Sequence, residues 1–239
     1  MATFVLVHGG GHGGWCWRRV TPLLRAAGHE VHAPTLTGMG ERVHLVGPNV
    51  GLEMHIADVL NVLKYEDLSD AILVGHSYGG MVITGVADRA LSRTRHLVFV
   101  DAVHPRDGES LADQIPAISD RFREGLSVVN PDDFVTGSIR ESVEFCGVHD
   151  EDDLAWVMRC FTPMPMKGWI EPLRLFNEPA VREIPYTNIN AGHFMPNRVG
   201  EDRRRILEGE RVWEIDSGHD LMVTAPRELA DRLLQVAAL

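Results

Sequence analysis

The sequence predicts an α/β fold, with a mostly parallel six-stranded sheet, helices on both of its faces and an inserted helical cap. Two observations predict it. Short apolar runs alternate along the chain with stretches whose apolar residues recur at helical spacing. Such alternation is typical of parallel sheets, because consecutive parallel strands are joined by crossover helices. The alternation stops once, over residues 104–184, and then resumes.

The predicted strands are apolar runs bounded by glycine, proline or charged residues. They cover residues 3–8, 29–33, 71–74, 96–100, 186–190 and 211–215. The predicted helices place an apolar residue every three to four positions, as Ile56, Val59 and Leu63 do. They cover residues 17–27, 54–65, 80–91, 199–207 and 225–238.

The interrupted stretch, residues 104–184, shows no strand pattern. Its short helix-like pieces are separated by Pro116, Pro131, Pro163, Pro165 and Pro179. Structureless loops of this length are rare in compact domains. We therefore expect a helical cap at residues 104–184, inserted into a core made of residues 1–103 and 185–239. The cap would close over the carboxyl ends of the strands, where sheets of this kind bind ligands.

The composition is that of an ordinary folded protein: 239 residues, of which 44% are hydrophobic and 24% charged. The formal net charge of −11 disfavours nucleic acid and anionic membranes as partners, because neutralising phosphates requires clustered cations. We expect a small-molecule substrate instead. No apolar stretch reaches the length of a membrane span. The oligomeric state stays open.

The three cysteines, Cys16, Cys146 and Cys160, are too few and too scattered for a disulfide framework or a zinc cluster. The start of the chain has neither the charged region nor the long apolar run of a signal peptide. We therefore expect a protein of a reducing compartment, the cytoplasm.

The sharpest motif is Gly75-His76-Ser77-Tyr78-Gly79, which follows a predicted strand and precedes a predicted helix. A serine at such a turn is typical of a nucleophile elbow. The serine adopts a strained backbone conformation, and the glycines two positions away avoid collisions with the neighbouring strand and helix. The helix N-terminus then faces the negative charge that forms during acyl transfer. We predict Ser77 as the catalytic nucleophile.

A serine nucleophile needs a base, which in this architecture follows the last strand. Of the 12 histidines, His219 directly follows the last predicted strand, and we predict it as the base. His76 should point away from the site, because neighbours in a tight turn diverge. His8 and His12 have i, i+4 spacing but lie in a glycine-rich turn without further ligands, so no metal is expected.

The glycine-rich loop at residues 8–14 lets its backbone approach a substrate. We predict the backbone N–H groups of Gly10 and Tyr78 as the two donors of an oxyanion hole. The loop also matches the dinucleotide-binding pattern G-x-G-x-x-G. That pattern requires an acidic residue at the end of the second strand, which here ends His-Ala-Pro. We expect no cofactor.

The chain resembles the α/β-hydrolase branch that contains plant methylesterases, hydroxynitrile lyases and related bacterial esterases. The resemblance extends over almost the whole chain and is carried by residues 4–10, 14–17, 34–38, 75–80 and 217–220. It implies the α/β-hydrolase fold and a serine-histidine-acid triad.

The acid of the triad departs from the pattern of this branch. In the plant members the acid follows the penultimate strand, but residues 186–192 contain no aspartate or glutamate. A triad needs a carboxylate to set the tautomer of His219 and to stabilise its charged form. We predict Asp101, at the end of the preceding strand, as this acid. The alternative is that Asp101 only caps a turn, while Asn190 or water orients His219.

These residues predict a serine hydrolase that cleaves a carboxylic ester, lactone or thioester of a small apolar or aromatic molecule through an acyl-enzyme. Some apolar residues of the predicted cap should face the substrate, from the set Phe122, Phe134, Phe145, Trp156, Met158, Phe161, Met164, Met166 and Trp169. Two alternatives stay open: a cofactor-free lyase or cyclase, and a non-catalytic receptor. The hydroxynitrile lyases of the branch carry a lysine directly after the base, where this chain has Asp220, which disfavours cyanohydrin cleavage.

Overall fold

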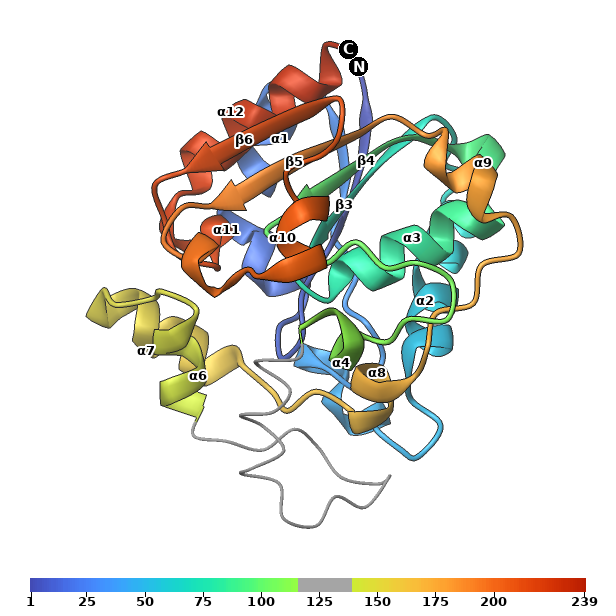
Figure 1. Cartoon of the computed structure of the whole chain (residues 1–239). Coiled ribbons are helices and arrows are strands. Elements are labelled where there is room, and N and C mark those ends of the chain that lie inside the picture. The colour runs from blue at the N-terminus through green and yellow to red at the C-terminus, as the bar shows by residue number, and fades with distance from the viewer. Residues whose placement is uncertain (116–138) are drawn as a thin grey trace.

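The computed structural model describes residues 1–115 and 139–239. Six strands form one sheet in the order β2-β1-β3-β4-β5-β6, and every neighbouring pair runs parallel (Figure 1). The strands are β1 (Thr3–Val7), β2 (Glu30–His32), β3 (Ala71–His76), β4 (Thr94–Val100), β5 (Tyr186–Ala191) and β6 (Arg211–Ile215). The predicted six-stranded sheet is thus confirmed, and it is parallel throughout.

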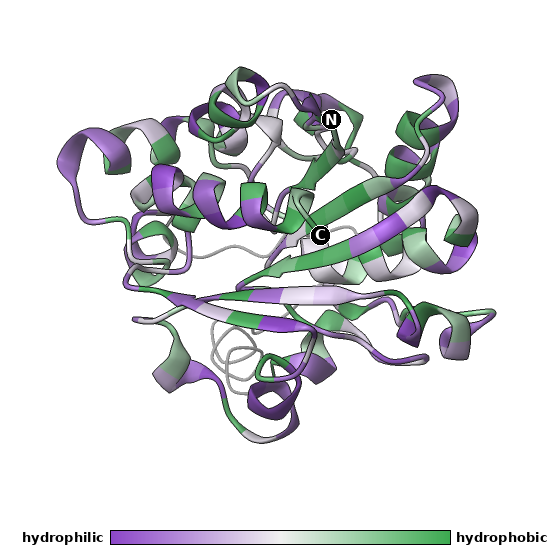
Figure 2. Ribbon diagram, turned by 90° about the horizontal axis from the view of Figure 1, so that it is seen from above, coloured by the Kyte–Doolittle hydropathy of each residue, from purple (hydrophilic) through white to green (hydrophobic). Residues whose placement is uncertain are grey.

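Successive residues of each central strand point to opposite faces of the sheet. In β1, Phe4 and Leu6 pack into one hydrophobic cluster, with α1 and α12, while Val5 and Val7 pack into a second cluster, with α2 and α3. Figure 2 shows the apolar strands running between these helices. The helices are α1 (Thr21–Ala26), α2 (Leu52–Tyr65), α3 (Gly79–Arg89) and α12 (Pro226–Ala237). Helices on both faces are confirmed.

Most element boundaries differ from the predictions by one or two residues, and two of the differences have clear local reasons. The helix predicted over residues 17–27 is split into a 3-10 helix and α1, because Pro22 in the first turn of α1 has no N–H to continue the hydrogen-bond ladder. Strand β3 extends to His76, because Gly75 and His76 still pair with β4. The shorter elements are η1 (Gly14–Arg19), η2 (Gly40–Leu45), η3 (Leu91–Arg93), η4 (Met195–Asn197), α10 (Gly200–Arg205) and α11 (Leu221–Thr224).

Between β4 and β5 the described residues form short helices and no strand. Helices α4, α6, α7 and α8 lie beyond the carboxyl ends of the strands, whereas α9 packs on α3 beside the sheet (Figure 1). The helices are α4 (Leu111–Gln114), α6 (Ile139–Phe145), α7 (Glu151–Cys160), α8 (Met166–Ile170) and α9 (Glu178–Arg182). The division into a core and a cap at residues 104 and 184 stays a prediction. Four of the residues named for the cap, Pro116, Pro131, Phe122 and Phe134, lie outside the described residues.

In the two described ranges, no helix combines the length and apolar character needed to cross a membrane.

Candidate active site

Ser77 sits at the turn between β3 and α3 with a φ of 52°, in the left-handed region that non-glycine residues rarely adopt. The flanking glycines make this turn possible. A Cβ at Gly75 would lie 2.6 Å from the carbonyl oxygen of Gly79, and one at Gly79 would lie 2.7 Å from the carbonyl oxygen of Val7. The sequence thus forms the strained turn expected of a nucleophile elbow.

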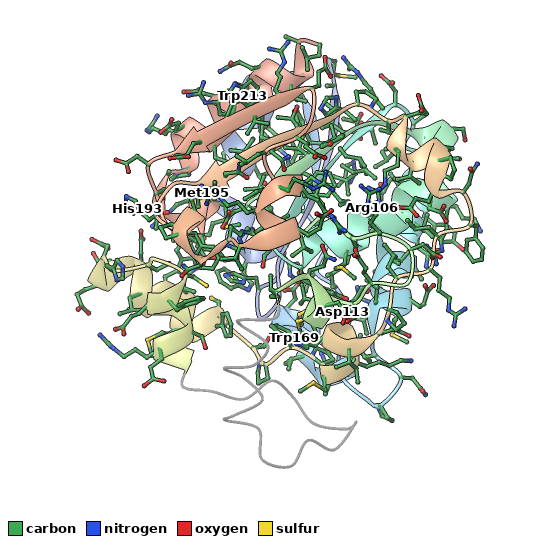
Figure 3. The ribbon with its side chains drawn as sticks, in the orientation of Figure 1. Arg106, Asp113, Trp169, His193, Met195 and Trp213 are labelled. Carbon is green, nitrogen blue, oxygen red and sulfur yellow. The ribbon has the colours of Figure 1, made fainter. Side chains whose placement is uncertain are left out.

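Ser77 is half-buried and opens into a cavity of about 150 Å³. The cavity lies at the carboxyl edge of the sheet, and His219 and Asp101 line it as well. Among the apolar residues named from the sequence, four line it: Phe145, Phe161, Met164 and Trp169. Trp169 comes from α8, close to α4, as Figure 3 shows. Most of the wall is therefore aromatic or apolar.

His219 lies in the loop between β6 and α11. Its ring stacks on Phe194 at a centroid distance of 4.6 Å. Its Nδ1 atom is hydrogen-bonded to a carboxylate oxygen of Asp101. Because a carboxylate only accepts, Nδ1 carries the proton, and Nε2 is the nitrogen left to accept one from Ser77.

Asp101 follows β4 with a φ of 42° and is fully buried. Burial by itself raises the pKa of a carboxyl group, but the charges of Arg198 and His219 outweigh it and hold the pKa of Asp101 at about 2. The carboxylate is therefore ionised at neutral pH. The structure brings together Asp101 and His219, as the acid prediction requires.

Asn190, the alternative partner of His219, faces a different element. Its side-chain amide donates to the backbone carbonyl of Ile206 at 3.0 Å. His193 and Asp216, which flank the site in sequence, bind each other with exposed side chains. Figure 3 shows His193 at the outer edge of the molecule. None of these three residues contacts His219 through a hydrogen bond.

Gly10 and Tyr78 both line the cavity, as an oxyanion hole requires. Within the described residues, neither backbone N–H donates to a protein acceptor, so both are available to a ligand. The Tyr78 side chain turns away and donates its hydroxyl proton to Nδ1 of His55 at 2.8 Å, while Nε2–H of His55 donates to the Thr37 carbonyl. This network holds Tyr78 in place beside Ser77.

The prediction that His76 points away from the site is wrong. As the last residue of β3, His76 follows the strand alternation and points to the same face as Val74. It lines the cavity, its ring lies 4.6 Å from that of His219, and its Nε2–H donates to the backbone carbonyl of His219 at 3.0 Å. Burial holds the pKa of His76 well below its usual value, so the ring is neutral.

The loop between α6 and α7 packs directly on the loop that carries His219. A Cβ at Gly147 would lie 2.6 Å from Cα of Gly218, and a Cβ at Gly218 would lie 2.6 Å from Cα of Gly147. The backbone N–H of Asp220 donates to the carbonyl of Cys146 at 3.2 Å. The loop that carries His219 is thus held by residues from between β4 and β5.

Two features of the site were not found from the sequence. Arg198 is buried, lines the cavity and binds Asp101. His12 and Asp220 form a buried pair, with Nε2 of His12 3.0 Å from Oδ2 of Asp220. Neither pairing has a local sequence signal. In the described part of the chain, no cluster of three histidine, cysteine or acidic side chains is arranged to hold a metal ion.

Comparison with known sequences identifies the family of this chain. A sequence model of the Alpha/beta hydrolase family matches residues 4–232. The chain belongs to this family. The alpha/beta hydrolase is 42% identical to a carbendazim hydrolyzing esterase of Nocardioides sp. (strain SG-4G), over 98% of each chain. It is 28% identical to Methylesterase 9 of Arabidopsis thaliana, over 99% of this chain and 98% of that one.

A solved structure supports the same family assignment. An extracellular alpha/beta-hydrolase from a Paenibacillus species, reported to share structural and functional homology with tobacco salicylic acid binding protein 2, matches with a TM-score of 0.83. The two are 26% identical over 98% of each chain. The fold and the suspected branch of the alpha/beta hydrolase family are confirmed.

Proposed function

We propose that this alpha/beta hydrolase cleaves carboxylic esters of small apolar or aromatic molecules through an acyl-enzyme. One observation carries the proposal. The ionised, buried carboxylate of Asp101 binds His219, and both side chains share one apolar cavity with the strained Ser77. This is the set of groups that an acyl-transfer enzyme needs.

Each group has one role in the proposed reaction. Ser77 Oγ attacks the ester carbonyl carbon while Nε2 of His219 takes its proton. Asp101 stabilises the imidazolium that forms, and the N–H groups of Gly10 and Tyr78 bind the oxyanion. His219 then protonates the leaving alcohol. A water molecule, deprotonated by His219, attacks the acyl-enzyme and releases the acid and Ser77.

The cavity supports a small substrate with an aromatic or apolar part. Its volume of about 150 Å³ is modest, and Phe145, Phe161, Phe194 and Trp169 supply aromatic walls. The names of the relatives point the same way, because one hydrolyses carbendazim and another is a methylesterase. We propose methyl esters and related small esters of aromatic acids as the substrate class.

The same site disfavours the two alternatives. A lyase that releases cyanide needs a cation beside the base, but Asp220 places a buried carboxylate there. A receptor needs no activated nucleophile, whereas Ser77 keeps its strained turn and His219 keeps its carboxylate. We further propose a cytoplasmic location, supported by three cysteines that are all free thiols. Fractionation of the source cells, with recovery in the cytosol, tests the location.

The function is tested with a substrate panel on the purified protein. The panel contains p-nitrophenyl and methyl esters of increasing chain length, methyl esters of aromatic acids, carbendazim and mandelonitrile. We expect ester hydrolysis with a preference for small or aromatic acyl groups, and no cyanide from mandelonitrile above the uncatalysed rate. A fluorophosphonate should label Ser77 alone, as located by peptide mass spectrometry. Failure to hydrolyse any ester, or no labelling of Ser77, would overturn the proposal.

A further inference from the structure

A second histidine-aspartate pair lies against the same cavity. Nε2 of His12 is 3.0 Å from Oδ2 of Asp220, and Nδ1 of His12 is 2.9 Å from the carbonyl oxygen of Gly10. A carboxylate and a carbonyl only accept hydrogen bonds, so each ring nitrogen must carry a proton. A histidine that donates from both nitrogens is an imidazolium cation. His12 lines the cavity, so this cation lies in the wall of the site.

The surroundings of His12 suit a cation. His12 is buried, with 2% of the residue exposed, and its ring stacks on that of Trp15 at a centroid distance of 5.4 Å, an arrangement that favours positive charge over the aromatic face. Burial lowers the pKa of His12, but the charge and hydrogen bond of Asp220 outweigh it, and the pKa is raised overall. Asp220 is fully buried with a pKa held at about 2, because His12 overcomes the effect of burial.

The other titratable groups around His12 and Asp220 are neutral or bound elsewhere, so they do not compete for the proton or the charge of this pair. From the end of β3, His76 meets the His12 ring edge-on at a centroid distance of 5.8 Å and is neutral. His8, in the same loop as His12, is also neutral, because burial lowers its pKa to about 3. Near Asp220, burial raises the thiol pKa of both Cys16 and Cys146, so both stay protonated. His219 is held by Asp101.

His8 and His12 both bind the backbone around Gly10, whose N–H is the proposed oxyanion donor. Nδ1–H of His8 donates to the Gly9 carbonyl, which belongs to the same peptide unit as the N–H of Gly10. Nδ1–H of His12 fixes the next carbonyl, that of Gly10. The backbone of Gly10 is thus held on both sides, although glycine has no side chain to restrain it.

We propose that His12, kept as a cation by Asp220, is a positioning residue that holds the Gly10 N–H toward the oxyanion and adds a positive charge beside it. This inference rests on the proposed function. The oxyanion exists only in the transition state and the tetrahedral intermediate, so losing the cation should lower kcat and leave KM nearly unchanged. Above the pKa of His12, one of its two hydrogen bonds is lost. Activity should therefore fall on the alkaline side.

The charge of His12 is tested first, by a measurement that does not depend on enzyme activity. We expect the ¹⁵N NMR shifts of the wild-type protein labelled in histidine to show both ring nitrogens of His12 protonated at pH 7.5. The His12→Asn variant identifies the signals by their loss. A neutral tautomer at pH 7.5 would overturn the inference. Because this readout needs no substrate, it separates a failure of the His12–Asp220 pair from a failure of the proposed esterase activity.

The positioning role is tested with kcat and KM on p-nitrophenyl acetate from pH 6 to 10. We expect His12→Asn to lower kcat about tenfold to hundredfold, with KM within threefold, less than the 10²–10³ typical of a lost donor. Asp220→Asn should move the alkaline limb to lower pH, because His12 then loses its proton more easily. The exposed controls His44→Asn and Asp216→Asn should behave as wild type. An unchanged kcat in His12→Asn, or an unmoved limb in Asp220→Asn, overturns the role. If either variant fails to fold, the wild-type NMR result decides.

Discussion

The guanidinium of Arg198 binds Asp101 at two points. Nη2 donates to the backbone carbonyl of Asp101 at 2.6 Å and lies 3.3 Å from its carboxylate Oδ1, while Nη1 donates to Asp202 at 2.9 Å. The other carboxylate oxygen of Asp101 binds His219. Arg198 therefore does two things for the proposed acid: it keeps the carboxylate ionised, and it fixes a left-handed residue at the end of β4.

Replacing Arg198 should change the pH profile. In Arg198→Met the pKa of Asp101 should rise, so the acidic limb of kcat/KM should move to higher pH. Arg198→Lys keeps the charge and should move the limb less, while losing the two-point contact. Breaking a buried pair costs about 3–5 kcal/mol, so urea unfolding should be measured on both variants. An acidic limb in Arg198→Met that coincides with the wild-type limb contradicts this role.

Neutralising the proposed acid should affect turnover far more than binding. In Asp101→Asn we expect kcat to fall about 10⁴-fold with little change in KM, because His219 then adopts the wrong tautomer. Asn190→Ala should do far less, since the Asn190 amide binds Ile206. The matched control is Asp216→Asn, whose carboxylate is exposed near His219 in sequence. Equal losses in Asp101→Asn and Asn190→Ala would refute the assignment.

Removing the hydroxyl of the proposed nucleophile should abolish activity and leave the fold intact. Ser77→Ala should lower kcat on the order of 10⁶-fold. Alanine and serine meet the same strain at a φ of 52°, so thermal unfolding should be unchanged. Ser92→Ala, at an exposed position of η3, is the control for purification and assay. Residual activity of more than a few per cent in a clean Ser77→Ala preparation shows that another group is the nucleophile.

Acid should destabilise the protein partly through His104. Its ring is buried and Nε2–H donates to Asn188 at 2.7 Å. Burial lowers the pKa of His104 to about 3, against about 6.5 when unfolded. Between these values the unfolded chain binds a proton that the native ring excludes. Stability therefore falls as pH falls, by up to about 1.4 kcal/mol per pH unit for this group.

His104→Gln keeps a donor for Asn188 but cannot titrate. Urea unfolding at pH 6 and pH 5 should therefore show a smaller loss of stability in this variant than in wild type. His44→Gln, at an exposed position, should keep the wild-type slope. Parallel slopes for wild type and His104→Gln would mean that the His104 ring is not excluded from protonation.

The sheet and the proposed nucleophile could be predicted because their signals are local. The strand, turn and helix around Ser77 lie within a few residues of each other, and an apolar run followed by the glycine-serine motif places them. Asp101 was reached by elimination, since it is a carboxylate at the end of a strand and β5 ends without one. The parallel order of the sheet then brings β4 next to β3, as the hydrogen-bond register shows.

The supporting contacts could not be predicted, because they join residues far apart in sequence. Arg198 lies 97 residues from Asp101, and His12 lies 208 residues from Asp220. No periodicity or turn pattern links such positions. In the sequence His12 could be noticed only for its i, i+4 spacing from His8, from which we expected no metal site. In the structure each of the two rings binds a carbonyl of the glycine-rich loop.

The contact between Gly147 and Gly218 bears on how enzymes of this shape can be re-engineered. Two backbones meet there with no space for a Cβ on either side. If the stretch between β4 and β5 were exchanged for that of a relative in order to transplant substrate preference, His219 would stay in place only if the inserted sequence also has glycine at position 147. The loop between α6 and α7 and the loop that carries His219 are, in this respect, a single part and not two interchangeable modules.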